Sequence, residues 1–211
     1  MNEVAQKIAE SLLQIKAIKL QPQKPFTWAS GWKSPIYCDN RVSLSHPAIR
    51  TYIRQKIAEI VQDEFGSVEM ISGVATAGIP QGVLVAQDLG LPFTYVRSSA
   101  KEHGRQNLIE GEVVSGQRVV VIEDLVSTGK SSLKAVEALR EAGCNVVGLV
   151  SIFSYGFEEA TENFKQAKCR LISLCSYQDL ISFAVEHNYI HSDEIERLES
   201  WRKDPANWTG T

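Results

Sequence analysis

Apolar residues recur along the chain with two different spacings, and these spacings predict an alternation of helices and strands. Amphipathic helical spacing predicts helices over residues 2–19, 45–65, 83–89, 132–140, 157–166, 178–187 and 192–203. Short apolar runs between them predict strands over residues 70–74, 93–97, 119–122, 145–152 and 169–174. Strands that alternate with helices are typical of an α/β fold, here a mainly parallel twisted sheet flanked by helices.

The two ends of the chain differ from this alternating middle. Residues 26–41 mix aromatic side chains with Ser, Gly and Pro, which predicts a hairpin or an ordered loop-and-strand unit; an aromatic cover over one end of the core is the alternative. We expect residues 1–211 to form a single domain, in which residues 1–45 and the C-terminal helices make a small hood. The tail 205–211 is expected to be loosely held.

Composition narrows the classes of protein to consider. The net charge of −3 shows no basic excess, so no nucleic-acid partner is expected. No run of eighteen apolar residues occurs, which predicts that no segment spans a membrane. The four cysteines are scattered without zinc-site spacing, and the N-terminal residues do not have the pattern of a signal peptide. We therefore expect a cytoplasmic protein with reduced thiols.

The segment 119–131, Val-Val-Val-Ile-Glu-Asp-Leu-Val-Ser-Thr-Gly-Lys-Ser, carries the clearest chemistry. Its β-branched start predicts a strand buried on both faces, and helical spacing follows it. Gly129-Lys130-Ser131 resembles the end of an ATP-binding Walker A loop. That loop would require glycine at position 124, where this chain has Asp124, whose charge would repel the phosphates. The ATPase interpretation is therefore excluded.

The two acids after this strand suit a different ligand. Carboxylates are hydrogen-bond acceptors, so Glu123 and Asp124 can bind a vicinal diol such as that of ribose. The backbone N–H groups of residues 127–131, at the N-terminus of a helix, can bind a phosphate, and the hydroxyls of Thr128 and Ser131 can add donors. Together these features predict a site for a ribose 5-phosphate. An ordinary strand–turn–helix with a capping hydroxyl is the alternative.

Segment 119–131 resembles the phosphoribosyl pyrophosphate (PRPP) motif of type I phosphoribosyltransferases. Residues 97–104, Arg-Ser-Ser-Ala-Lys-Glu-His-Gly, resemble the catalytic loop of the orotate phosphoribosyltransferase family, and residues 26–31 with 34–37 resemble that family's N-terminal segment. The three motifs stand in the family's order and span about the whole chain. The resemblance implies the conversion of orotate and PRPP to orotidine 5′-monophosphate and pyrophosphate, in pyrimidine (UMP) biosynthesis.

The resemblance also implies roles for individual residues. Arg97, Lys101 and His103 would be catalytic and would stabilise the pyrophosphate from the partner subunit of a homodimer. The residues implied to bind PRPP are Arg97, Lys101, His103, Glu123, Asp124, Leu125, Val126, Ser127, Thr128, Gly129, Lys130 and Ser131. Ser127 would also contact orotate. Mg²⁺ would be held mainly by PRPP and water, so no residue is expected to form a dedicated metal site.

The sequence departs from the family at three positions. Ser98, Ala29 and Ala77 stand where many or some members have lysine, and Lys33 or Arg41 could supply the missing positive charge. Two alternatives also stay open: a phosphoribosyltransferase for another nucleobase, and a PRPP-binding regulator that contacts nucleic acid. The net charge and the presence of Lys101 and His103 argue against the regulator.

Overall fold

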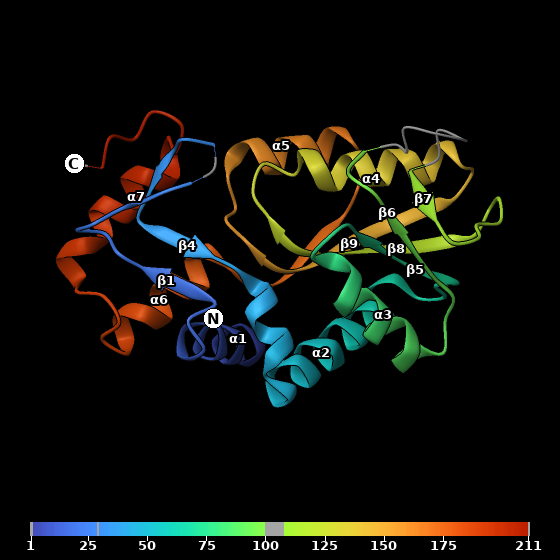
Figure 1. The fold of residues 1–211 in the computed structure, drawn as a ribbon, viewed down its shortest axis with the longest axis horizontal. Helices are drawn as coiled ribbons and strands as arrows, with labels where there is room; N and C mark the ends of the chain where they lie inside the picture. The colour runs from blue at the N-terminus through green and yellow to red at the C-terminus, as the bar shows by residue number, and fades with distance from the viewer. Residues whose placement is uncertain (1, 29, 100–107, 211) are drawn as a thin grey trace.

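A six-stranded sheet forms the centre of the protein (Figure 1). The structure, a computed structural model, describes residues 2–28, 30–99 and 108–210. The strands lie in the order β10-β9-β8-β5-β6-β7, and only β7 runs antiparallel to its neighbour within this described sheet. Their bounds are β5 Met70–Val74, β6 Phe93–Val96, β7 Ile109–Glu110, β8 Arg118–Val126, β9 Asn145–Ser154 and β10 Leu171–Ser176. The predicted α/β fold with a mainly parallel sheet is confirmed.

Helices cover both faces of the sheet. Figure 1 shows α1 (Glu3–Gln14), α2 (Pro47–Phe65) and α3 (Gly78–Leu89) below it, and α4 (Lys130–Glu141) and α5 (Glu158–Gln166) above it. Successive side chains of a strand point to opposite faces. Val120 and Ile122 of β8 accordingly pack in the core with α1 and α2, whereas Val119 and Val121 pack in the core with α4 and α5. The consecutive β-branched residues of β8 are explained by burial on both faces.

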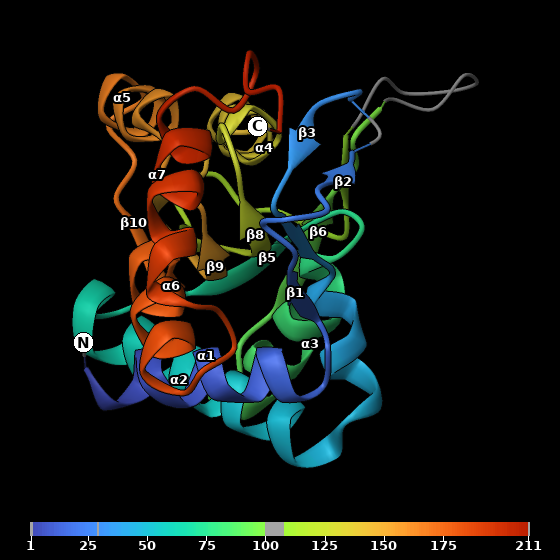
Figure 2. The ribbon, with the colours of Figure 1, turned by 90° about the vertical axis from the view of Figure 1, so that its left-hand side faces the viewer.

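The N-terminal strands and the C-terminal helices lie together at one end of the sheet (Figures 1 and 2). This end unit contains antiparallel pairs of β1 (Ile18–Leu20) with β4 (Ile36–Cys38) and of β2 (Phe26–Thr27) with β3 (Lys33–Ser34). It also contains α6 (Tyr177–Glu186) and α7 (Ile195–Lys203), with the 3-10 turn η2 (Ser192–Glu194) before α7. Another 3-10 turn, η1 (Asn40–Ser45), leads from β4 into α2.

An aromatic cluster holds the end unit against the sheet. The Trp201 side chain is fully buried, and its ring lies 5.7 Å from Trp28, 5.6 Å from Tyr155 and 5.5 Å from Phe157. Trp28 comes from the segment after β2, and Tyr155 follows β9. The cluster therefore joins the N-terminal hairpin, the C-terminal helix α7 and the carboxyl end of the sheet.

Two sequence predictions about the chain ends are wrong. The first helix ends at Gln14 rather than at residue 19, because Lys16 adopts a positive φ of 58° and Ile18 pairs with Cys38 in a strand. This pairing with a distant strand outweighs the local helical spacing. The tail is also not loose throughout, since Trp208 is 9% exposed and packs on the main core.

The strand that carries the acids is longer than predicted. β8 continues through Glu123 and Asp124 to Val126, because β9 extends beside it and pairs Leu125 with Phe153 and Val126 with Ser154. The two acids therefore lie within the last part of the strand rather than after it. The other predicted strands are confirmed, with bounds shifted by a few residues, and the helix predicted over 45–65 begins at Pro47.

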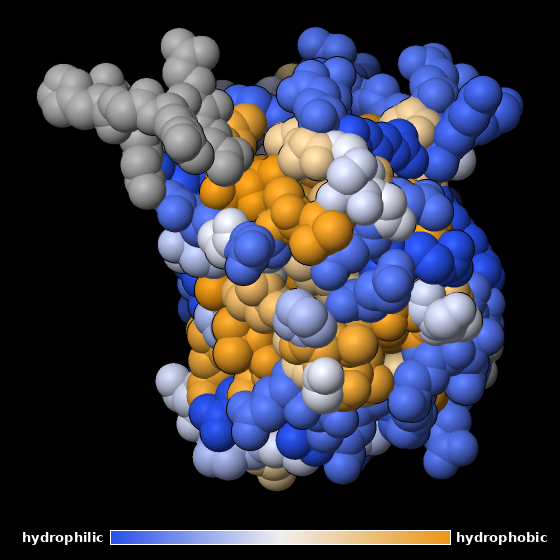
Figure 3. Space-filling model, turned by 90° about the vertical axis from the view of Figure 1, so that its right-hand side faces the viewer, coloured by the Kyte–Doolittle hydropathy of each residue, from blue (hydrophilic) through white to orange (hydrophobic). Residues whose placement is uncertain are grey.

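An apolar area covers much of the face at the right-hand side of Figure 1, as the space-filling view in Figure 3 shows. Figure 1 places α3, β6 and β7 on this side. Val83 of α3 and Val114, which follows β7, are large hydrophobic residues that stay 42% and 58% exposed. Within the described ranges, no helix has both the length and the apolar content to cross a membrane.

We predict that Trp201→Ala lowers the free energy of unfolding by about 3–5 kcal/mol, because it removes a fully buried ring from the aromatic cluster. Urea unfolding followed by circular dichroism measures this change. Trp201→Phe is the matched control and should cost clearly less, since it keeps an aromatic ring, and the indole N–H has no hydrogen-bond partner in the described structure. Equal losses in both variants would contradict the packing role.

Candidate active site

The first acid of the pair in β8, Glu123, is held by two hydrogen bonds inside the protein. Glu123 is 6% exposed; its Oε2 accepts a hydrogen bond from the Ser132 hydroxyl at 3.0 Å, and its Oε1 accepts one from the Asp124 backbone N–H at 3.0 Å. Ser132 lies in the first turn of α4 and is itself buried. The helix that follows the strand thus fixes the orientation of the first carboxylate.

Burial changes the acidity of both carboxyl groups. The pKa of Glu123 is raised well above its ordinary value, first by burial and then by the neighbouring charge of Asp124. Burial also raises the pKa of Asp124, against the opposing effect of its hydrogen bond with Glu123. Two carboxyl groups side by side in a buried place favour a neutral or proton-sharing state until a ligand supplies donors. The pair is therefore suited to accept hydroxyl groups.

The turn after β5 approaches this pair closely. A Cβ atom added to Gly78 would lie 2.4 Å from the carbonyl oxygen of Ile122 and 3.3 Å from the Cα of Glu123. No other residue type fits against β8 at that distance without displacing backbone. Gly78, the first residue of α3, therefore lies directly beside the strand that carries the acidic pair.

The turn of residues 127–129 follows β8 and leads into α4 at Lys130. Gly129 adopts a positive φ of 79°, a conformation that favours glycine, and its carbonyl accepts the N–H of Leu133. The N–H groups of residues 130–132 precede that bond and have no acceptor within the helix. Ser127 and Thr128 are half-buried, and Lys130 and Ser131 are exposed. This arrangement, with the positive end of the helix dipole, can bind an anion.

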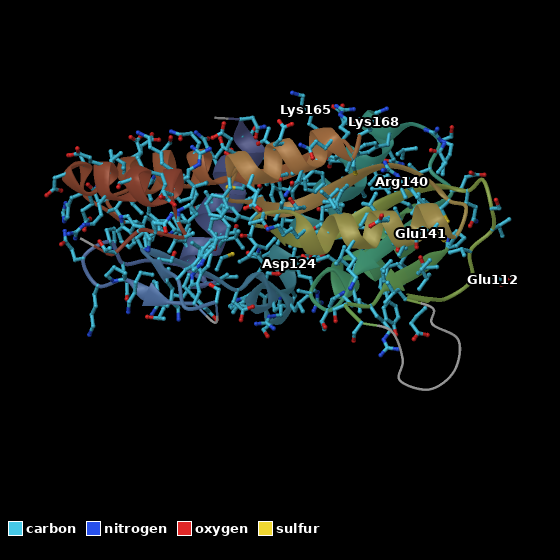
Figure 4. All side chains as sticks on the ribbon, turned by 90° about the horizontal axis from the view of Figure 1, so that it is seen from above. Glu112, Asp124, Arg140, Glu141, Lys165 and Lys168 are labelled. Atoms are coloured by element: carbon cyan, nitrogen blue, oxygen red, sulfur yellow. The ribbon has the colours of Figure 1, made fainter. Side chains whose placement is uncertain are left out.

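Asn40, the first residue of η1, connects the segment after the end unit's β4 to the backbone of Asp124. Figure 4 labels Asp124 between the end unit and α4. The amide of Asn40, 2% exposed, donates to the Asp124 carbonyl at 2.8 Å. The two cations that the sequence suggested near the base already have partners: Arg41 binds both oxygens of Asp39, and Lys33 donates to the Thr27 hydroxyl at 2.8 Å.

The predicted catalytic loop is described only at its edges. Arg97 follows β6, two strands away from β8, and its guanidinium lies 3.5 Å from the Glu110 carboxylate of β7. Lys134 of α4 donates to the carbonyl of Ser98 at 3.1 Å, which places the start of the loop beside α4. Lys101 and His103 lie outside the described residues.

The structure adds three residues that the sequence did not indicate. Asn40 and Ser132 bind the acidic pair, and Asn163 of α5 donates its amide to the Thr128 carbonyl at 2.9 Å. Asn40 and Ser132 stand next to the recognised motifs, so their polarity at buried positions was an available signal. Asn163 lies 35 residues from its partner on an ordinary amphipathic helix, and only the fold brings the two together.

Comparisons with known proteins identify the family. The model of the phosphoribosyl transferase domain matches residues 43–189. The orotate phosphoribosyltransferase of Phocaeicola vulgatus is 56% identical over 99% of this chain and 98% of its own length, and that of Porphyromonas gingivalis is 53% identical over 99% of each chain.

Solved structures agree with this result. The crystal structure of orotate phosphoribosyltransferase from Aeropyrum pernix has a TM-score of 0.76 and 28% identity, covering 87% of this chain and 99% of that one. The Mycobacterium tuberculosis orotate phosphoribosyltransferase in complex with PRPP has a TM-score of 0.65 and 26% identity, covering 84% and 98%. The chain therefore belongs to the phosphoribosyl transferase domain family and, within it, to the orotate phosphoribosyltransferases.

Proposed function

We propose that this protein transfers the 5-phosphoribosyl group from PRPP to orotate, giving orotidine 5′-monophosphate and pyrophosphate in pyrimidine biosynthesis. The observation that carries this proposal is the pairing of a buried acidic pair with an anion-binding turn. Glu123 and Asp124 lie at the end of β8, and the turn 127–129 with the N-terminus of α4 follows within a few residues. A ribose with hydroxyls on one side and a 5′-phosphate on the other fits this order of groups.

The reaction breaks the bond between C1′ of ribose and the pyrophosphate oxygen and forms a bond from C1′ to a ring nitrogen of orotate. We assign the ribose hydroxyls to Glu123 and Asp124, and the 5′-phosphate to the turn and helix start made by Leu125, Val126, Ser127, Thr128, Gly129, Lys130 and Ser131. Ser127 would also contact orotate. Positive charge develops on the ribose and negative charge on the leaving pyrophosphate, so fixed carboxylates and fixed N–H donors stabilise opposite sides of the transition state.

Magnesium is proposed to enter with PRPP. No group of three or more His, Cys, Asp or Glu side chains that could hold a metal occurs in the ranges that the structure describes. We propose that the ion is held mainly by pyrophosphate oxygens and by water, which Mg²⁺ retains readily. The ion would supply charge neutralisation for the leaving group.

A homodimer is proposed to complete the site with Arg97, Lys101 and His103 from the partner. The apolar area in Figure 3 supports this proposal, because it lies on the side of α3, β6 and β7, and Arg97 follows β6. Burying exposed apolar residues such as Val83 and Val114 in a subunit interface would be favourable.

We also propose that residues 1–211 form one domain, in which the end unit, with α1 and η1, is the hood of the site. The protein is proposed to be cytoplasmic.

An activity assay with several nucleobases tests which base the protein uses. The purified protein with PRPP and Mg²⁺ should convert orotate to orotidine 5′-monophosphate, while hypoxanthine, guanine, xanthine and uracil should react far more slowly. Product formation is measured by chromatography and by the absorbance change of orotate. Turnover of a purine in preference to orotate would favour a different phosphoribosyltransferase, and no turnover of any base with salt-dependent binding to nucleic acid would favour a regulator.

Replacing the buried acid should separate activity from stability. Glu123→Gln keeps the shape of the side chain: its amide oxygen can accept the Asp124 N–H and its amide nitrogen can donate to the Ser132 hydroxyl, but the charge that binds the ribose hydroxyls is removed. We expect kcat/KM for PRPP to fall about tenfold or more, because bonds to a charged acceptor are the stronger ones. At pH 8 the variant should be more stable than the natural protein.

The sign of that stability change follows from the raised pKa of Glu123. Between its ordinary and its raised pKa, Glu123 keeps a proton in the folded state that the unfolded chain releases. Its stabilising contribution to the free energy of unfolding is therefore present below the ordinary pKa of 4.5 and is lost as the pH rises through the raised value. Glu123→Gln avoids that loss. Its gain in free energy of unfolding over the natural protein should therefore be smaller at pH 5 than at pH 8. Urea unfolding at both pH values measures it; a constant difference would contradict the assignment.

Mixing two inactive variants tests the shared site. If Lys101 acts across the dimer, Lys101→Ala mixed with Asp124→Ala should recover about a quarter of the natural activity, because half of the dimers are mixed and each has one intact site. Mixing Glu123→Gln with Asp124→Ala is the control and should not recover activity, since both residues belong to the same subunit's site. Recovery in neither mixture would place Lys101 in its own subunit's site.

A further inference from the structure

Helix α5 contacts three residues of the segment that we assign to the 5′-phosphate. The Asn163 amide donates to the Thr128 carbonyl at 2.9 Å. The Phe164 ring packs so closely on Gly129 that an added Cβ would lie 2.7 Å from Cε2. Glu159 forms an ion pair with Lys130 at 2.7 Å. Three side chains from two turns of one helix thus meet the last two residues of the turn and the first residue of α4.

The bond from Asn163 determines where one phosphate donor points. In a trans peptide the C=O and N–H groups point in opposite directions. The Thr128–Gly129 peptide is not among the cis bonds of the described chain, so an amide of α5 that holds the Thr128 oxygen directs the Gly129 N–H away from α5. The positive φ of Gly129, 79°, then turns the chain into the first turn of α4. The Gly129 N–H is thereby directed to the side opposite α5.

Helix α5 is itself firmly held. Ala160 and Phe164 are buried in the core beside α4. Arg140 of α4 donates to the carbonyls of Ala167 and Lys168, just after α5, at 2.7 and 3.2 Å. Figure 4 shows Arg140 and Lys168 near one another where the two helices end. A fixed helix can therefore impose its geometry on the turn.

The three contacts differ in what they contribute. The Lys130–Glu159 pair is largely exposed, with side chains 73% and 47% accessible, so solvent screens it and it adds little. The Phe164 ring fills the space against Gly129, but an apolar contact of this kind does not orient a peptide group. The amide of Asn163 is a directional donor to a backbone group, and an aspartate of the same shape would place an acceptor against the Thr128 oxygen. The orientation of the turn therefore depends mainly on Asn163.

We propose that Asn163 is a positioning residue that sets the affinity of the site for the 5′-phosphate of PRPP and of the nucleotide product. This inference rests on the proposed function. Asn163 contacts no substrate in this assignment and acts only through the Thr128–Gly129 peptide. Ligands that carry the ribose 5′-phosphate are therefore sensitive to it, and pyrophosphate, which binds elsewhere in the site, is not.

The experiment compares inhibition constants of ribose 5-phosphate and pyrophosphate, each measured against PRPP in the forward reaction. Asn163→Ala should raise the constant of ribose 5-phosphate about fivefold, the effect of one lost hydrogen bond, and Asn163→Asp should raise it more. The constant for pyrophosphate should stay within about twofold in both. KM for PRPP should rise more than kcat falls in both variants.

Gln166→Ala is the matched control. Gln166 has the same amide group on the same helix, is exposed, and bonds only to Glu162 among the described contacts, at 3.3 Å. This variant should leave both constants unchanged. Thermal unfolding of all three variants identifies any loss of fold, and the alanine variant carries the test if the aspartate variant does not fold.

The outcomes separate the two proposals. A natural protein that forms no orotidine 5′-monophosphate would overturn the proposed function itself. A natural protein that is active, with variants whose inhibition constants for ribose 5-phosphate are unchanged, would overturn the role of Asn163 alone. Equal weakening of ribose 5-phosphate and pyrophosphate would also overturn it, because a general disturbance of the site would then explain the loss.

Discussion

The burial of Glu123 is the constraint on which the surrounding structure depends. A carboxyl group with 6% exposure must have hydrogen-bond donors nearby, since leaving it without partners would cost several kcal/mol. The Ser132 hydroxyl and the Asp124 N–H supply those donors. Gly78 lets the turn after β5 close over the same place, and a side chain there would meet the Ile122 carbonyl. The elements α3 and α4 are thus positioned around one acid, which stays poised to accept hydroxyl groups.

Residues 123–131 keep the two acids apart from the turn that can bind an anion. The acids lie inside the end of β8, and the turn of residues 127–129 begins only after Val126, where β8 parts from β9. A phosphate on the helix start would therefore not lie directly against the carboxylates of Glu123 and Asp124. The buried Gly129 and the ring of Phe164 keep this turn in one shape. Both halves of a ribose 5-phosphate can be held by a rigid surface, which reduces the ordering cost of binding.

Local patterns predicted the central fold well. The alternation of strands and helices, the burial of β8 on both faces and the start of α2 at Pro47 are all encoded by neighbouring residues. The errors arose where distant segments pair. Ile18 continues the helical spacing of α1, yet it lies in β1 because Cys38 pairs with it, and Trp208 is buried because the core receives the tail. Such contacts leave no local signal.

In the candidate site, too, local residues could be predicted from the sequence and contacts between distant segments could not. The donor half is one continuous stretch, residues 123–131, so its chemistry could be predicted from the residues alone. The surroundings of this stretch depend on contacts across the chain: Asn40 reaches the carbonyl of Asp124 over 84 positions, and Trp28 meets Trp201. Lys33 and Arg41, which sequence proximity suggested as substitutes for the missing lysines, bind Thr27 and Asp39 instead. Arg41 is paired with a carboxylate, so its charge is balanced by its neighbour, whereas Lys33 keeps its charge and is only held in place by a hydroxyl. Sequence proximity could not reveal either contact, because both depend on the fold of the segment between β2 and η1.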